Sequence, residues 1–194
     1  MNRRELLATA LLAAALQGPA LAATVDGYSF EDQARVADAD LLLNGVGFRG
    51  VRIFKAYSAS LYLTHKSEQP AQVLAMPGPK RLRIRMLWDV PSVEFAKAFE
   101  LGVTRNTAAS ELPALKERMA TFDAMVRAIG KVRKGDVVDL DLVPGQGLVF
   151  MLNGKPRGEP IAGADLYAAL LRIFIGDLPV DDRLKAGLLG GTLK

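Results

Sequence analysis

Apolar residues with a period of two predict strands in the first half of the chain. Residues 25–30 fit a short strand, and residues 51–63 form a longer run rich in β-branched and aromatic residues. The glycine-rich residues 44–50 are expected to form turns before that long strand. Residues 80–88 predict a further strand, one face of which carries Leu82, Ile84, Met86 and Trp88.

Two stretches with helical periodicity follow. Ser92 is a suitable N-cap for a helix in which Phe95, Phe99 and Val103 recur at helical spacing. The second helix ends near Gly130, and its apolar stripe consists of Leu112, Leu115, Met119, Phe122, Val126 and Ile129.

The last third of the chain returns to strands and then to helices. Residues 136–143 and 148–152 predict two strands, joined by a glycine-rich hairpin turn at residues 144–147. A third strand is expected at residues 157–161. The remaining elements are a helix at residues 164–174 and a short helix at residues 181–189, whose start Asp181 and Asp182 are expected to cap and charge.

The order of these elements predicts the fold class. Strands joined by tight turns favour an antiparallel sheet with helices on one face, and the lack of strict strand–helix alternation argues against a doubly wound parallel sheet. On the alternating residues 80–85 the arginines take one face, and Asp139 and Asp141 are expected to pair across the sheet with Arg83 and Arg85.

The N-terminal residues have the pattern of a secretory signal peptide. Arg3 and Arg4 precede a short apolar run, and Ala20-Leu21-Ala22 forms a small-x-small cleavage site. Residues 1–22 are therefore predicted to be a signal peptide and residues 23–194 a single domain, periplasmic or secreted. The paired arginines also fit a twin-arginine signal, and an uncleaved anchor helix is the alternative. No later apolar run is long enough to span a membrane.

Composition narrows the chemistry. The chain has no cysteine and one histidine, His65, which excludes disulfides, thiol catalysis and histidine-rich metal sites. No cofactor is expected. The formal net charge of +4 is modest, and the basic residues 80–85 alternate with apolar ones, so nucleic acid is not an expected partner.

Several segments together resemble the chalcone isomerase-like family. They are Gly45-Val46-Gly47-Phe48-Arg49 and residues 54–63, 89–106, 174–180 and 184–190, in family order across most of the mature chain. Together with the N-terminal signal pattern, which favours a bacterial periplasm, the resemblance leads us to expect a bacterial, exported member. It implies an α+β fold, an open-faced β-sandwich in which a layer of helices covers a large antiparallel sheet, with a ligand cleft between the layers.

The resemblance also implies site residues. Arg49 matches an arginine that lines the cleft of plant chalcone isomerases, and Tyr57 falls where those enzymes place a threonine. Fatty-acid-binding relatives use an arginine and a tyrosine at these two places. Phe95 and Phe99 would form the apolar floor. From the residues alone, Arg49 also fits a surface loop and Tyr57 also fits the core.

The sequence departs from the plant enzymes at two catalytic positions. These enzymes carry a tyrosine and an asparagine that match positions near Phe95 and Gly102, and neither residue here offers a side-chain hydrogen bond. The sequence therefore predicts a non-catalytic protein that binds a fatty acid or similar small amphipathic carboxylate. The alternatives are an isomerase or lyase that uses Arg49 as its electrophilic group, and a protein-interaction module with a filled cleft.

Overall fold

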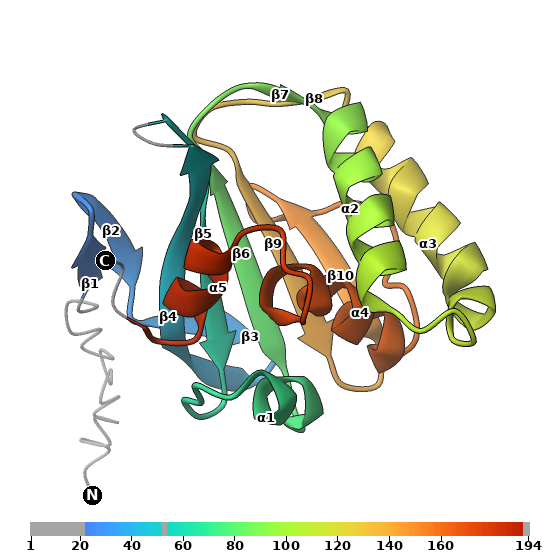
Figure 1. Cartoon of the computed structure of the whole chain (residues 1–194), viewed down its shortest axis with the longest axis horizontal. Coiled ribbons are helices and arrows are strands. Elements are labelled where there is room, and N and C mark those ends of the chain that lie inside the picture. Colours follow the sequence, from blue (N-terminus) through green and yellow to red (C-terminus); the bar gives the residue numbers. More distant parts are fainter. Residues whose placement is uncertain (1–21, 52–53, 192–194) are drawn as a thin grey trace, which may run out of the picture.

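A curled antiparallel sheet of seven strands forms the centre of the molecule (Figure 1). The computed structural model describes residues 22–51 and 54–191; the predicted signal peptide lies almost entirely outside them. All neighbouring strands in this sheet are antiparallel. Across the sheet the order is β11 (Lys155–Pro156), β10 (Gly147–Leu152), β9 (Val137–Val143), β6 (Lys80–Met86), β5 (Phe54–Leu63), β4 (Ala39–Val51) and β3 (Gln33–Val36).

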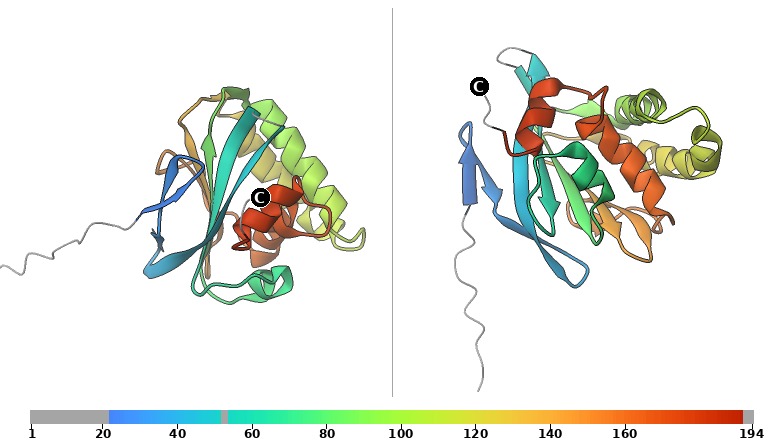
Figure 2. Two further views of the ribbon diagram at one scale, coloured as in Figure 1. Left: turned by 60° about the vertical axis from the view of Figure 1, so that its left-hand side comes forward. Right: turned by 60° about the horizontal axis from the view of Figure 1, so that its bottom comes forward.

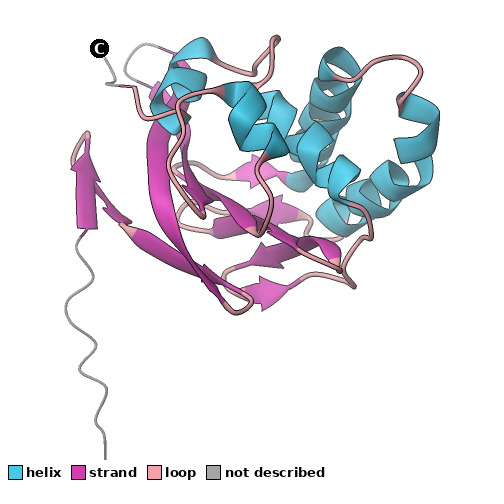
Figure 3. Cartoon of the chain, turned by 90° about the horizontal axis from the view of Figure 1, so that it is seen from below, coloured by secondary structure: helices cyan, strands magenta, loops and turns pink. Residues whose placement is uncertain are grey.

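The helices cover one face of this sheet, and a hairpin lies on the other face (Figures 2 and 3). The helices are α1 (Pro70–Ala75), α2 (Ser92–Asn106), α3 (Leu112–Arg127), α4 (Ala164–Ile175) and α5 (Asp182–Leu188). The hairpin consists of β1 (Ala22–Val25) and β2 (Tyr28–Glu31), and the short strands β7 (Val90–Pro91) and β8 (Lys131–Val132) pair beside α2. The predicted α+β class, an antiparallel sheet covered by helices, is confirmed. Within the described ranges, every helix is too short or too polar to cross a membrane.

The face of the sheet toward the helices is apolar. Leu82, Ile84 and Met86 are each 1% exposed and belong to the main hydrophobic core, as the period of two predicts. The prediction is wrong for Trp88, which is 53% exposed. Strand β6 ends at Met86, so the alternation of side chains ends there and does not extend to position 88.

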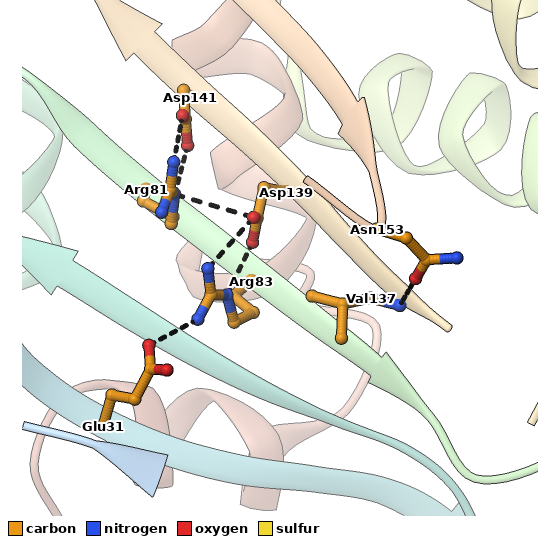
Figure 4. Close-up of polar contacts among 7 residues, drawn as sticks. All are labelled: Glu31, Arg81, Arg83, Val137, Asp139, Asp141 and Asn153. Carbon is orange, nitrogen blue, oxygen red and sulfur yellow. Dashed lines mark hydrogen bonds and ion pairs between the residues drawn. The ribbon is translucent and has the colours of Figure 1, made fainter. Parts of the chain in front are cut away.

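The opposite face of the sheet carries a buried ladder of charge pairs (Figure 4). Arg81 donates two hydrogen bonds to Asp141, at 2.7 and 2.6 Å, and Arg83 donates two to Asp139, at 2.7 and 3.1 Å. Glu31 of the hairpin accepts a further bond from Arg83 at 2.8 Å. The predicted pairing of Asp139 with Arg83 is therefore correct.

The predicted pairing of Asp141 with Arg85 is wrong. The β6–β9 register sets Arg81 opposite Asp141 and Arg85 opposite Val137. The two aspartates lie two positions apart, and so do successive arginines of β6. The aspartates can therefore face either the first two or the last two of the three arginines. The sequence pattern alone does not choose between those registers.

The glycine-rich residues 44–50 form strand rather than turns. Strand β4 continues through them to Val51, and β5 begins only at Phe54. A Cβ atom on Gly45 would lie 2.1 Å from the carbonyl oxygen of Gly187, and one on Gly47 would lie 2.5 Å from that of Leu184. These glycines are needed because α5 packs directly on the strand, which the sequence pattern does not reveal.

Two other predicted strands differ in detail. Residues 25–30 form a hairpin rather than one strand, because Asp26 and Gly27 adopt positive φ angles of 52° and 80° and reverse the chain. Residues 157–161 form no strand: Ile161 makes an isolated bridge to Leu148, and the backbone N–H of Arg157 donates to the oxygen of Phe150 at 2.8 Å. Strand β3 and helix α1 were not predicted.

Breaking the charge ladder should destabilise the fold, because it leaves a buried charge without its partner. Asp141→Asn leaves the guanidinium of Arg81, whose side chain is 10% exposed, without its bidentate partner. We expect the free energy of unfolding to fall by about 3–5 kcal/mol, measured by urea denaturation. The matched control is Glu31→Gln on the same ladder, whose side chain is 62% exposed. It should cost less than about 1 kcal/mol. Equal losses in both variants would contradict this assignment.

Candidate ligand-binding site

A cavity of about 540 Å³ lies between the sheet and the helices, beside the start of α2 and the segment that precedes α5. Its lining includes all four predicted site residues: Arg49, Tyr57, Phe95 and Phe99. We refer to it as the Arg49 cavity. The rest of its wall is mostly apolar and includes Ile84, Met86, Val90, Ile173, Phe174 and Val180.

Strand pairing brings Arg49 and Tyr57 together. The two residues are direct cross-strand partners on β4 and β5, so their side chains leave the sheet on the same face. On β4 this face carries Gly45, Gly47 and then Arg49, by the strand period of two. Helix α5 rests on the two glycines, and Arg49 is the first residue on this face with a side chain long enough to reach the cavity.

Tyr57 is a neutral hydrogen-bond donor at this end of the cavity. Its side chain is 7% exposed, and burial raises the pKa of its phenol. The positive charge of Arg49 and a hydrogen-bonding contact with it act in the opposite direction, and the charge of Asp181 raises the pKa further. The net shift is upward, so the hydroxyl keeps its proton at neutral pH.

The charge of Arg49 is available to a ligand. Among residues 22–51 and 54–191, no carboxylate lies within ion-pair distance of it. Two acidic residues also line the cavity, but each has another partner. Asp181 accepts a 2.9 Å bond from the backbone N–H of Leu184, as the predicted cap of α5, and Glu94 pairs with Lys97 at 3.0 Å.

Aromatic side chains form the floor of the cavity. Phe95 and Phe99 lie on α2 with ring centroids 6.3 Å apart, and Phe99 continues the stack to Phe122 at 5.2 Å. Phe99 is buried and Phe95 is half-buried. Phe99 also lines a second, larger cavity of about 720 Å³ between α2 and α3.

The position matched to a catalytic asparagine has a structural reason to be glycine. A Cβ atom on Gly102 would lie 2.8 Å from side-chain carbons of Ile173 on α4. The two helices are in close contact there, so a larger residue at position 102 would push them apart. Gly102 is not part of the cavity lining.

The sequence did not identify Asp181 as a lining residue, nor Ile173, Phe174 and Val180. These residues come from the end of α4 and the loop before α5, far from β4 in the sequence. Part of this stretch lies in the segment 174–180 that carried the family resemblance, which was the available signal. The described residues contain no group of three acidic or histidine side chains suited to a metal ion.

The curled antiparallel sheet, its helical layer and the cavity between them define the chalcone isomerase type of fold. The chain belongs to the chalcone isomerase-like family, which it matches over residues 22–190. A solved structure with this fold is that of a fatty-acid binding protein from Arabidopsis thaliana, with a TM-score of 0.66 and 15% sequence identity. The alignment covers 87% of this chain and 96% of that one. At this identity the likeness shows a shared fold. No curated protein sequence gives a significant match.

The contact between Arg49 and Tyr57 predicts a shift in titration. In Arg49→Ala the pKa of Tyr57 should rise further, because the lowering effect of the guanidinium is lost. The measurement is an NMR titration of ¹³C-labelled tyrosine, with Tyr57→Phe to assign the signal. Arg85→Ala is the control, because Arg85 is an exposed residue on the opposite face of the sheet.

The same shift affects stability at alkaline pH. The folded-state pKa of Tyr57 lies above the ordinary 10.0, so the unfolded chain loses this proton first. The contribution of Tyr57 is complete below pH 10.0 and declines as the pH rises through the folded-state value. Tyr57→Phe should reduce this alkaline decline in stability.

For the titration experiment, an unchanged pKa of Tyr57 in Arg49→Ala would contradict the electrostatic coupling between Arg49 and Tyr57.

Proposed function

We propose that this protein binds a fatty acid or similar small amphipathic carboxylate in the Arg49 cavity and does not catalyse a reaction on it. The observation that carries the proposal is an arginine that has no carboxylate within ion-pair distance among the described residues, beside a neutral tyrosine hydroxyl, in a cavity whose remaining wall is mostly apolar.

The polar end suits a carboxylate. A guanidinium presents paired N–H donors that match the two oxygens of a carboxylate, and such charge-assisted bonds are strong. The protonated hydroxyl of Tyr57 can donate one further bond. An anionic head group would then compensate the half-buried charge of Arg49, which is costly to leave without a partner.

The apolar wall suits a hydrocarbon chain. Phe95, Phe99 and Met86 offer surfaces without hydrogen-bonding groups, so an alkyl chain can replace water there without loss of hydrogen bonds. The volume of about 540 Å³ lies in the usual range for small-molecule sites.

The polar groups of the cavity do not support ring closure of the chalcone isomerase kind. Phe95 stands near one donor position of the plant enzymes and offers no hydrogen bond, and Gly102 lies outside the cavity. The cavity therefore lacks counterparts of these two donors, although Arg49 and Tyr57 remain as hydrogen-bond donors. The fatty-acid binding protein from Arabidopsis thaliana with the same fold supports a binding function.

Affinity should depend on the charge of Arg49 and on the length of the ligand. Each methylene buried contributes about 0.8 kcal/mol, so affinity should rise with chain length until the cavity is full. Arg49→Ala should weaken every acid by about tenfold to a hundredfold, for a charge-assisted bond of roughly 1.5–3 kcal/mol. Arg49→Lys should recover part of the loss, and Tyr57→Phe should cost about 0.5–1.5 kcal/mol.

The measurement is a calorimetric titration of fatty acids of increasing length against wild type and these variants. Arg35→Ala is the control, because Arg35 lies on the exposed face of β3 and contacts Asp40 and the backbone oxygen of Asp38 at the surface. If affinity does not depend on chain length, or if Arg49→Ala binds as tightly as wild type, the protein-interaction alternative replaces this proposal.

The floor of the cavity should limit the length of the ligand. Phe95→Trp adds volume at a half-buried wall position, so the longest acids should lose affinity while the shortest keep theirs. Each displaced methylene should cost about fourfold. Leu101→Trp, on the same helix but 59% exposed, is the matched control and should not change the series. Equal loss for all lengths in Phe95→Trp would place the alkyl chain elsewhere.

We also propose that the protein is exported after cleavage behind Ala22. The proposal rests on the charge, apolar run and small residues of the N-terminus, and the family match begins only at residue 22. N-terminal sequencing of exported protein should give a chain that begins at Ala23, and Ala20→Arg should prevent this cleavage. A membrane-bound form that retains Met1 would contradict the proposal.

A further inference from the structure

A separate cavity lies at the other end of β6. It has a volume of about 450 Å³, and its lining includes Lys80, Tyr167, Met76, Leu142 and Leu171. We refer to it as the Lys80 cavity. Met86, at the far end of the same strand, lines the Arg49 cavity. Met86 lies six positions along the strand from Lys80, which is roughly 20 Å.

Lys80 is a buried cation on the apolar face of the sheet. It shares the strand face of Leu82 and Ile84, toward the helices, and is 3% exposed. Its ammonium donates to the backbone oxygen of Met76, at the end of α1, but an ammonium has three N–H donors. Within the described part of the chain, no carboxylate is within ion-pair distance of it.

Tyr167 supplies a second unused polar group. Its side chain is 2% exposed, and its hydroxyl has no hydrogen-bond partner among the described residues. Buried hydroxyls in proteins nearly always have a partner. Two buried residues with unused hydrogen-bonding capacity thus line one cavity. The hydroxyl oxygen of Tyr167 is itself enclosed, so it becomes available to a ligand when its side chain turns toward the cavity.

We propose that the Lys80 cavity binds a short-chain monocarboxylate, as a site distinct from the Arg49 cavity. The carboxylate would accept hydrogen bonds from Lys80 and Tyr167 and would neutralise the buried charge, while a short alkyl group would contact Leu142 and Leu171.

The nearby carboxylate of Asp165 does not neutralise the ammonium of Lys80. Asp165 on the first turn of α4 is bound by Arg118 through two hydrogen bonds of 2.5 and 2.7 Å, and its side chain is 57% exposed. Burial lowers the pKa of Lys80, which is the response of an ammonium that has no anionic partner.

The alternative role for Lys80 is purely structural, as a cap on the last turn of α1. The two roles differ in an observable way. A structural cap needs no ligand, so the signals of Lys80 would not respond to carboxylates. A binding site requires that added carboxylate changes the surroundings of the ammonium.

The experiment is an NMR titration of protein with ¹³C-labelled lysine, with butyrate as the probe. Butyramide is the neutral analogue, and inorganic phosphate is a second anion. Lys80→Met, which keeps the side-chain length and removes the charge, assigns the signal. Butyrate should shift the Lys80 ε-carbon signal saturably in wild type and in Arg49→Ala, whereas butyramide and phosphate should not.

Calorimetry with butyrate on Arg49→Ala protein then measures the affinity of the Lys80 cavity for butyrate, because carboxylate binding in the Arg49 cavity is weakened in this variant. Adding Lys80→Met should weaken binding about tenfold or more, and adding Tyr167→Phe should weaken it about two- to tenfold. Lys66→Met, at an exposed position, is the control and should not change it.

Three outcomes would overturn the proposal. They are a Lys80 signal that ignores butyrate, equal shifts with butyramide or phosphate, and butyrate binding that survives Lys80→Met but disappears in Arg49→Ala. Failure of long-chain acids to bind at Arg49 would contradict the proposed function and leave this site untouched, because Lys80→Met and Arg49→Ala affect separate cavities.

Discussion

The direct packing of α5 on β4 is the contact on which the site depends. Gly45 and Gly47 leave no room for a side chain between strand and helix, so the backbones of these elements touch. This contact fixes the start of α5, where Asp181 caps the helix and lines the Arg49 cavity. Arg49 is the next residue on this face of β4 after the two glycines. It lies just beyond the part of the strand on which the helix rests, so its side chain can reach the cavity.

The sheet separates two kinds of polar chemistry. On the face under the β1–β2 hairpin, arginines and aspartates satisfy one another within the ladder of Arg81, Asp141, Arg83 and Asp139. Such buried pairs contribute to a unique strand register, because a shifted register would leave charges without partners. On the face toward the helices, Arg49 and Lys80 are cations without an acidic partner among the described residues. Both lie where strands end and the helical layer is incomplete, so each meets a cavity.

The family resemblance named four residues that the structure brings to one cavity, whereas the local pattern misplaced several strands. Arg49 and Tyr57 were expected from the order of the sequence blocks, and the structure makes them cross-strand partners in one cavity. The segment around Arg49 was nevertheless expected to form turns, because glycines usually mark turns and the packing of α5 cannot be seen in the local sequence. The Lys80 cavity had no sequence signal. Its parts, at positions 76, 80 and 167, are brought together only by the fold.

The sequence by itself determined those helices and strands in which the spacing of apolar residues shows which side is buried. The apolar stripe of α3 and the alternation of Leu82, Ile84 and Met86 describe which side of each element faces the core, and this information is local. Tertiary structure alone decided the β6–β9 register, the strand conformation of Gly45 and Gly47, and the meeting of β4, α2 and the α4–α5 loop around one cavity. Each of these outcomes depends on contacts between residues far apart in the chain. A local pattern of apolar and polar positions shows which side of an element is buried, but it does not show which distant element packs against that side.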